Sequence, residues 1–213
     1  MPAAPRFDDA FRARLRDLLV WRRDVRQFRT DPLPEDALER LIEAAALAPS
    51  VGLSQPWRFV LVEDPARRAA VRASFSACNA EALSRQAPER AASYARLKLE
   101  GLDAAPVHLA VFSDPATLQG HGLGRMTMPE TIDYSVVMAV HTLWLAARAE
   151  GIGVGWVSIL DPAEVQAALE VPATWTFIGY FCIGYPQAEA DSPALEQLGW
   201  ERRRAAAGTL LRR

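Results

Sequence analysis

The chain has 213 residues, of which half are hydrophobic and 23% are charged, and its formal net charge at pH 7 is −2. This balance is typical of a globular protein rather than a disordered one, and we expect a single domain over residues 1–213. The slightly negative charge argues against a nucleic-acid-binding surface, although a few arginines around one phosphate remain compatible with it.

The N-terminal residues and the few cysteines indicate a cytoplasmic protein. The first residues do not form a secretory signal, and the most apolar stretch, residues 134–149, is too short to span a membrane. The only cysteines, Cys78 and Cys182, suit a reducing compartment and are expected to remain unpaired. The three histidines lack the spacing of metal ligands, so we predict no metal site.

Apolar periodicity and turn residues predict a helix-rich chain with four strands. The predicted helices cover residues 8–21, the segment from Pro34 to about residue 47, residues 65–85, 88–100 and 131–150, and a short stretch opened by Asp161 and Pro162. The predicted strands cover residues 57–62, 106–112, 153–159 and 175–183. This order favours an α+β fold.

Two segments indicate contact with a second copy. The predicted helix at 131–150 is apolar on nearly all faces, so in a chain of this size a partner subunit is one way to bury it. The tail from about residue 186 carries the apolar residues Leu195, Leu198 and Trp200, and we expect it to wrap onto the partner.

The first feature with chemical meaning is a group of three arginines, Arg22, Arg23 and Arg26. The segment looks extended, so alternation places Arg22, Asp24 and Arg26 on one face and Arg23 on the other. Guanidinium groups match phosphate oxygens in a bidentate manner. The spacing therefore fits either a phosphomonoester site or a solvated basic patch.

Two further features are weak when taken alone. The loop at 48–57 contains Ser50 and offers hydroxyl, amide and backbone N–H groups just before a strand, which also suits an ordinary turn. The strand that begins Gly153-Val154-Gly155-Trp156 allows close approach of a backbone or a ligand. It lacks the GxGxxG pattern, so no Rossmann cofactor site is implied.

Together and in this order, the three features resemble the nitroreductase family of flavoproteins. The resemblance extends from about residue 15 to 204, and its motifs are similar to those of a flavin-fragmenting branch of that family. These motifs lie at residues 22–26, 48–57, 97–102, 124–130, 155–162 and 199–201. The resemblance implies a nitroreductase-like α+β fold, with a mostly antiparallel central sheet flanked by helices. It also implies an intertwined homodimer with FMN at the interface.

The activity implied by this resemblance consumes the flavin. Reduced FMN and O₂ would give 5,6-dimethylbenzimidazole, the lower ligand of cobalamin, and erythrose 4-phosphate. NAD(P)H would act as the indirect electron source, and a flavin reductase is an expected partner. Asp24 and Ser158 are the expected catalytic residues. The expected FMN-binding residues are Arg22, Arg23, Asp24, Val25, Arg26, Ser50, Leu99, Gly155, Trp156, Ser158 and Arg202, with Arg203 as the alternative to Arg202.

Two positions depart from the ordinary reductase pattern. Asp24 stands where reductases commonly carry Ser, and a carboxylate among phosphate-binding arginines needs an ion pair or a catalytic role. Leu53 stands where many carry Asn, which indicates a drier pocket. The loop at 120–130 and the stretch at 97–102 are candidate lids. The alternative functions are an NAD(P)H-dependent nitro or quinone reductase and a non-catalytic flavin-binding protein.

Overall fold

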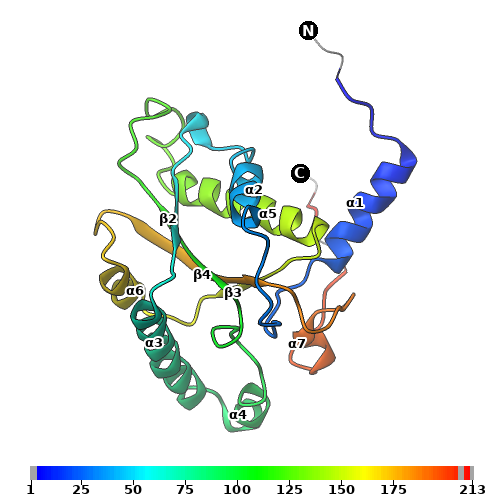
Figure 1. The fold of residues 1–213 in the computed structure, drawn as a ribbon, viewed down its shortest axis with the longest axis vertical. Coiled ribbons are helices and arrows are strands. Elements are labelled where there is room, and N and C mark those ends of the chain that lie inside the picture. The colour runs from blue at the N-terminus through cyan, green and yellow to red at the C-terminus, as the bar shows by residue number, and fades with distance from the viewer. Residues whose placement is uncertain (1–3, 206–208, 212–213) are drawn as a thin grey trace.

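The computed structural model describes residues 4–205 and 209–211 (Figure 1). Its helices are α1 (Asp9–Trp21), α2 (Ala37–Ala45), α3 (Pro65–Ser84), α4 (Pro88–Tyr94), α5 (Thr131–Ala149), α6 (Pro162–Leu169) and α7 (Ala194–Gln197), with a 3-10 turn η1 (Val51–Leu53). Its strands are β1 (Trp57–Leu61), β2 (Val107–Ser113), β3 (Gly153–Val157) and β4 (Thr176–Gly184). The predicted α+β class is confirmed.

Local hydrogen bonds explain where several helices begin and end. The Asp8 side chain accepts from the Phe11 N–H at 2.7 Å and starts α1, and Asp161 caps α6 as expected. Gly151, with φ of 73°, ends α5 in the left-handed conformation that glycine favours. These boundaries follow from residues that lie next to one another in the sequence.

The sheet has the order β1-β2-β4-β3, and each neighbouring pair is antiparallel. This confirms the mostly antiparallel sheet. The segment at 22–28 is extended as predicted and lies along the outer edge of β3, where the Val25 N–H donates to the Val154 carbonyl at 3.0 Å. The three arginines are therefore attached to one edge of the sheet.

Helices cover both faces of the sheet (Figure 1). On one face, α2 and α5 pack against strand residues such as Leu109 and Val111. On the other face, α3 and α6 pack against the alternate residues, including Ala110 and Phe112. Each buried strand face thus has its own apolar core.

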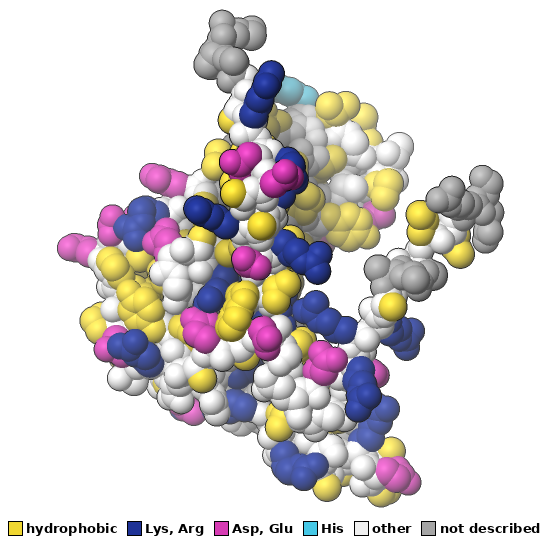
Figure 2. All heavy atoms as spheres, turned by 90° about the vertical axis from the view of Figure 1, so that its right-hand side faces the viewer, with side chains coloured by type: hydrophobic (Ala, Val, Ile, Leu, Met, Phe, Trp, Pro, Cys, Tyr) yellow, Lys and Arg dark blue, Asp and Glu magenta, His cyan; other side chains and the backbone are white. Residues whose placement is uncertain are grey.

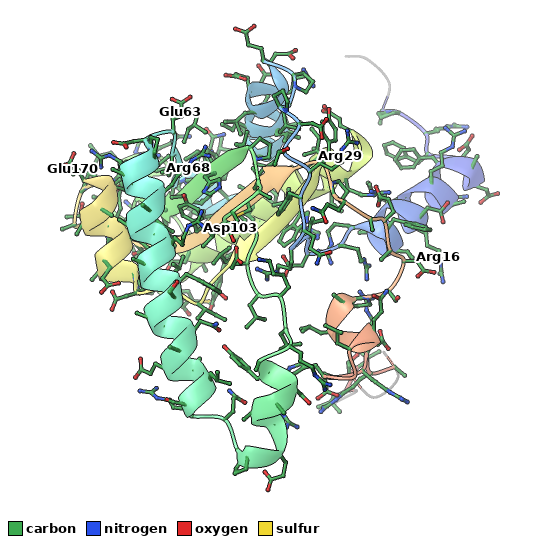
Figure 3. All side chains as sticks on the ribbon, turned by 60° about the horizontal axis from the view of Figure 1, so that its bottom comes forward. Arg16, Arg29, Glu63, Arg68, Asp103 and Glu170 are labelled. Atoms are coloured by element: carbon green, nitrogen blue, oxygen red, sulfur yellow. The ribbon has the colours of Figure 1, made fainter. Side chains whose placement is uncertain are left out.

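Arg68 ties α3 to the sheet from the side of the helix that faces it (Figure 3). Its guanidinium donates to the carbonyls of Val62 at 2.7 Å and Pro106 at 3.1 Å. Deeper in this core, His108 Nδ1 lies 3.0 Å from the Tyr180 hydroxyl. Burial lowers the pKa of His108 to about 4 and raises that of Tyr180.

The helix expected over 88–100 is wrong in its C-terminal half, because α4 ends at Tyr94. Two backbone carbonyls of the segment that follows accept hydrogen bonds from arginine side chains of other elements instead of from the N–H groups of a continuing helix. Leu99 O accepts from Arg26 at 2.6 Å, and Leu102 O accepts from Arg72 at 3.2 Å. The helix α7 in the tail was not expected.

Within one chain the burial of α5 is one-sided, and the expected burial of its other faces against a partner subunit stays a prediction. Its inner face packs against α2 and the sheet, but Tyr134, Val137 and Met138 are exposed. No residue of α1 is buried either, and its exposed apolar side chains include Leu15 and Leu19. Among the described helices, none combines the length and apolar character that crossing a membrane requires.

Candidate functional site

Asp24 is held between the edge of β3 and Arg26. Its Oδ1 accepts from the Trp156 backbone N–H at 2.9 Å, and its Oδ2 forms an ion pair with Arg26. The surrounding protein raises the pKa of Asp24 by desolvation, against the opposing effects of Arg26 and the Trp156 N–H. The side chain remains 42% exposed. Asp24 is therefore a fixed carboxyl group that solvent or a ligand can reach.

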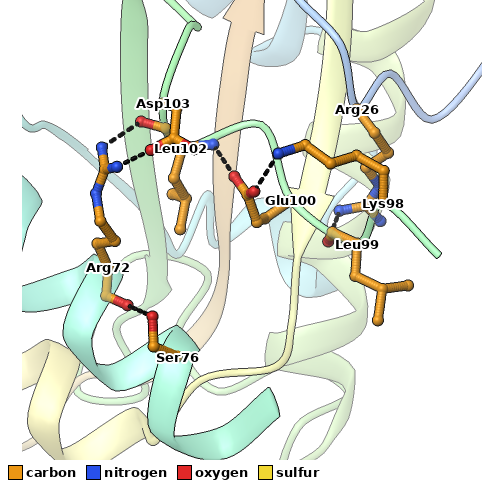
Figure 4. Close-up of polar contacts among 8 residues, drawn as sticks. All are labelled: Arg26, Arg72, Ser76, Lys98, Leu99, Glu100, Leu102 and Asp103. Atoms are coloured by element: carbon orange, nitrogen blue, oxygen red, sulfur yellow. Dashed lines mark hydrogen bonds and ion pairs between the residues drawn. The ribbon is translucent and has the colours of Figure 1, made fainter. Parts of the chain in front are cut away.

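Arg26 links Asp24 to the segment that follows α4. Its side chain is only 19% exposed, and its Nη1 donates to Leu99 O at 2.6 Å (Figure 4). Its Nη2 binds Asp24. In the same segment Glu100 pairs with Lys98. Two Arg26 donors are thus engaged by protein acceptors, and its expected contact with FMN stays a prediction.

Arg22 and Arg23 differ from Arg26, because neither forms an ion pair within the described residues. The Arg22 guanidinium lies 5.0 Å from the centre of the Trp144 ring, and Arg23 Nε is buried without a hydrogen-bond partner in the described chain. Burial lowers the pKa of both groups, and the nearby positive charge of Arg203 lowers it further. The charge of Asp24 opposes this lowering at Arg22, and that of Asp191 opposes it at Arg23.

The tail arginine that acts electrostatically on this cluster is Arg203. It contributes to the lowered pKa of both Arg22 and Arg23. Arg202, the first choice from sequence, forms a backbone N–H contact to Glu201 Oε1 at 2.9 Å. Binding of FMN by Arg202, or by Arg203 as its alternative, stays a prediction.

The two glycines of β3 serve the approach of the 22–28 segment. A Cβ at Gly155 would lie 2.0 Å from Val25 O, and one at Gly153 would lie 2.8 Å from Val25 Cγ2. Larger residues would therefore push the arginine segment away from the sheet. The expected contacts of Val25 and Gly155 with FMN stay predictions.

Trp156 presents its backbone to Asp24 and its side chain to the core. The indole lies across Gly179, where a Cβ would be 2.2 Å from Nε1, and its ring centre is 5.0 Å from that of Phe181. Two residues later, Ser158 is exposed just beyond β3, and its hydroxyl has no hydrogen-bond partner in the described residues. Both expected catalytic residues therefore flank β3.

Ser50 lies far from these groups within one chain. Its Oγ accepts from the Gln55 N–H at 3.1 Å, and the adjacent Val51 N–H donates to Ser135 Oγ at 3.0 Å, near the start of α5. Trp144, which donates to Arg23 O at 3.1 Å, is nine residues further along α5. These two contact points are about 13 Å apart along the helix axis. The structure does not bring Ser50 and the arginines together within one protomer.

The loop after β2 packs on the Ser50 loop. Gln119 Nε2 donates to Leu53 O at 2.8 Å, and a Cβ at Gly120 would lie 2.6 Å from Gly52 O. Leu53 has a φ of 57°, a backbone conformation that L residues rarely adopt, and its apolar side chain is 69% exposed.

Sequence reasoning missed the residues that surround the arginines from other elements. A small pocket beside them is lined in part by Trp21, Arg22, Arg23, Trp144, Arg148 and Glu189. Arg148, in the last turn of α5, forms an ion pair with Glu189 at 2.6 Å. Helical periodicity predicted that Trp144 belongs to an apolar helix. It gave no indication of the contact with Arg23, which is more than a hundred residues away in the sequence.

Comparison with known proteins agrees with this architecture. Residues 19–185 match the model of the nitroreductase family. A 5,6-dimethylbenzimidazole synthase from Rhodospirillum rubrum is 61% identical over 96% of this chain and 97% of its own length. One from Rhodobacter capsulatus is 49% identical over 92% and 94%, respectively. A crystal structure of oxidised iodotyrosine deiodinase bound to FMN and 3-iodo-L-tyrosine aligns with a TM-score of 0.70 and 26% identity. That alignment covers 83% of this chain and 91% of the other.

Proposed function

This chain belongs to the nitroreductase family, and we propose that it fragments reduced FMN with O₂ to 5,6-dimethylbenzimidazole and erythrose 4-phosphate. The observation that carries this proposal is 61% identity, over 96% of the chain, to a 5,6-dimethylbenzimidazole synthase. The enzyme is a flavin-consuming oxidoreductase, and its product is the lower ligand of cobalamin.

The arginine cluster fits the phosphate of FMN. Arg22 and Arg23 are partly buried, and neither forms an ion pair with a carboxylate within the described residues. The positive charge of Arg203 lowers the pKa of both groups. A dianionic phosphate would relieve this repulsion and accept several guanidinium hydrogen bonds. We therefore assign the phosphate end of FMN to Arg22 and Arg23, with a tail arginine closing over it.

When bound, the reduced flavin would supply the reaction with O₂. The protein would supply binding, orientation, proton transfer and exclusion of water. Asp24 suits proton transfer, because its environment favours a protonated carboxyl more than water does. Arg26 and the Trp156 N–H fix its two oxygens. Ser158 offers an exposed hydroxyl just beyond the same strand. We propose that Asp24 and Ser158 move protons to and from the ribityl region.

We propose that the enzyme is a homodimer whose FMN site combines two protomers. The exposed apolar side chains of α5 and α1 form a surface that a monomer would leave in water. The Ser50 loop and the arginines lie near opposite ends of α5. An antiparallel pairing of two α5 helices would therefore bring the Ser50 loop of one copy to the arginines of the other.

Light scattering at micromolar concentration tests the assembly. A dimer of this kind is expected to bury on the order of 2,000 Å² or more, so it should persist at that concentration with FMN present. A monomeric mass under these conditions would contradict the shared site.

We further propose that NAD(P)H supplies electrons indirectly, through a flavin reductase that delivers reduced FMN. The described structure has free thiols at Cys78 and Cys182, which suits a reaction in the reducing cytoplasm.

One incubation tests the activity. The purified protein receives FMN, NADH, a separate flavin reductase and O₂, and chromatography follows the formation of 5,6-dimethylbenzimidazole. Product that depends on the protein supports the proposal. Oxidation of NADH without the separate reductase and without the benzimidazole would favour a nitro or quinone reductase. Tight FMN binding with no turnover would favour a flavin-binding protein.

A further inference from the structure

The 98–103 segment, which follows α4, touches the 22–28 segment at two points. The Leu99 carbonyl accepts from Arg26 Nη1 at 2.6 Å. Two residues later, a Cβ at Gly101 would lie 2.3 Å from the ring of Phe28, which is only 1% exposed. The backbone of the 98–103 segment therefore lies directly against the strand-like segment that carries Asp24 and Arg26.

Glu100 holds the 98–103 segment from within. Its side chain is 13% exposed, and its carboxylate accepts from the Leu102 N–H at 2.5 Å and pairs with Lys98 at 2.5 Å (Figure 4). One carboxylate thereby connects the residues on either side of the stretch that contains Leu99 and Gly101. This local contact determines the shape of the segment, but it does not attach the segment to the rest of the fold.

The attachment to the fold comes from Arg72 on α3. Its guanidinium donates to Leu102 O at 3.2 Å and forms an ion pair with Asp103 (Figure 4). A guanidinium is a planar fork that binds two acceptors at once, so it fixes direction as well as distance. The helix α3 is itself packed in the core through Val71 and Phe75. Arg72 thus ties the 98–103 segment to the core.

We infer that Arg72 is a positioning residue for Asp24 and Arg26, because it fixes the segment whose Leu99 carbonyl holds Arg26 in place. This inference rests on the proposed function, in which Asp24 transfers protons. Arg26 is anchored at two points, Leu99 O and Asp24, and a guanidinium that loses one anchor is free to rotate about the other. Movement of the 98–103 segment would therefore loosen one of the two contacts that orient the Asp24 carboxylate, the other being the Trp156 N–H.

Arg67 provides a matched control on the same helix. It also binds one carbonyl and one carboxylate, Ala168 O at 2.6 Å and Glu170 at 2.5 Å, but these lie at the end of α6. Arg67→Ala and Arg72→Ala therefore remove the same charge and the same kinds of contact from α3. Alanine favours the helical conformation at both positions. If Arg72→Ala does not fold, Arg72→Gln keeps more of the side chain and replaces it.

Amide exchange of the flavin-free protein tests the positioning itself. Arg72→Ala should speed exchange about 3- to 30-fold in the 98–103 segment and in the 22–28 segment, where the Val25 N–H binds Val154 O. Arg67→Ala should leave both segments unchanged. Unchanged exchange at 22–28 in Arg72→Ala would overturn the inference, and so would an equal increase in Arg67→Ala.

Binding of oxidised riboflavin and FMN, followed by flavin fluorescence, tests the consequence for the site. Figure 2 shows basic side chains along the tail and on the face that carries α1, so a lost charge alone affects an anionic ligand. Riboflavin has no phosphate and avoids this effect. Arg72→Ala should weaken both flavins to a similar degree, about 3- to 30-fold, whereas Arg67→Ala should leave riboflavin binding unchanged.

A double variant tests whether Arg72 acts through Arg26. Arg26→Ala combined with Arg72→Ala should bind riboflavin no more weakly than Arg26→Ala alone, because both changes act through one contact. Additive losses would overturn the inference, as would a loss in Arg67→Ala equal to that in Arg72→Ala. Because the readouts are exchange and binding, a protein that behaves as expected in both but makes no benzimidazole would contradict the proposed activity alone.

Discussion

Two groups of arginines that are adjacent in sequence have opposite surroundings in the structure. Arg26 is engaged by Asp24 and by Leu99 O, whereas Arg22 and Arg23 form no ion pair with a carboxylate within the described chain. Burial lowers the pKa of both of these arginines. A paired arginine is suited to orienting a neighbouring group, while unpaired and partly desolvated arginines are suited to an anionic ligand. We therefore predict that one short segment serves two different purposes.

The largest effect expected from this comparison is on turnover. Asp24→Asn keeps the shape of the side chain but removes its charge, and general acid–base catalysis contributes typically 10²–10⁴-fold. We expect the variant to bind FMN, and to bind it more tightly because a negative charge is gone. It should lose 5,6-dimethylbenzimidazole formation by about that factor, and oxidised FMN should be recovered intact after reaction with O₂.

The control for Asp24→Asn is Asp31→Asn. Asp31 also pairs with an arginine two residues away, Arg29, at 2.8 Å, but both side chains are exposed. Its replacement should leave product formation unchanged. Near-normal product formation by Asp24→Asn at saturating reduced FMN would contradict the catalytic role of Asp24. Its role would then be limited to pairing with the arginines.

A second prediction separates the stability of the fold from FMN binding by means of His108, whose Nδ1 lies 3.0 Å from the Tyr180 hydroxyl. The pKa of His108 is lowered to about 4 in the folded state against about 6.5 in the unfolded chain. Between these values only the unfolded state binds the proton, so stability should fall as the pH falls from 6.5 to 4. The loss is about 3 kcal/mol over that window.

Denaturant unfolding at fixed protein concentration across this pH range measures that loss. His108→Gln should flatten the slope while leaving the ratio of FMN to riboflavin affinity unchanged. An unchanged slope would show that another group causes the acid sensitivity. The variant also shows what global destabilisation alone does to flavin binding.

A third prediction concerns ligand selectivity within the arginine segment. Arg22→Ala and Arg23→Ala should each weaken FMN about 10- to 100-fold and affect riboflavin much less, because only FMN carries the phosphate. Arg26→Ala should weaken both flavins to a similar degree, since it disturbs Asp24 and Leu99. Titration of all three variants, with Arg29→Ala as the control, measures the difference. A selective loss for Arg26→Ala would instead place its guanidinium at the phosphate.

The smallest effect is expected in the loop at 120–130. If it closes over the flavin of the partner protomer, saturation with FMN should slow its amide exchange and its proteolysis. The stretch at 97–102, which Arg26 already binds, should change less. Unchanged exchange in the loop would show that it is not a lid.

The sequence alone determined the local features of this protein. Asp161 and Gly151 mark helix ends through hydrogen bonds to near neighbours, and apolar alternation defines the strands. The order of its motifs was enough to indicate the flavoprotein family. The extended segment with Asp24 and Arg26 on one face also followed from the period of two.

Only the tertiary structure decided how the arginines are divided. The partners of Arg26 and Asp24 include Leu99 and Trp156, which are 73 and 132 residues away from them, respectively. The early end of α4 and the distance between Ser50 and the arginines are equally non-local. Periodicity and capping depend on residues within one or two turns, whereas hydrogen bonds to a distant carbonyl or N–H group depend on how the helices and strands pack together.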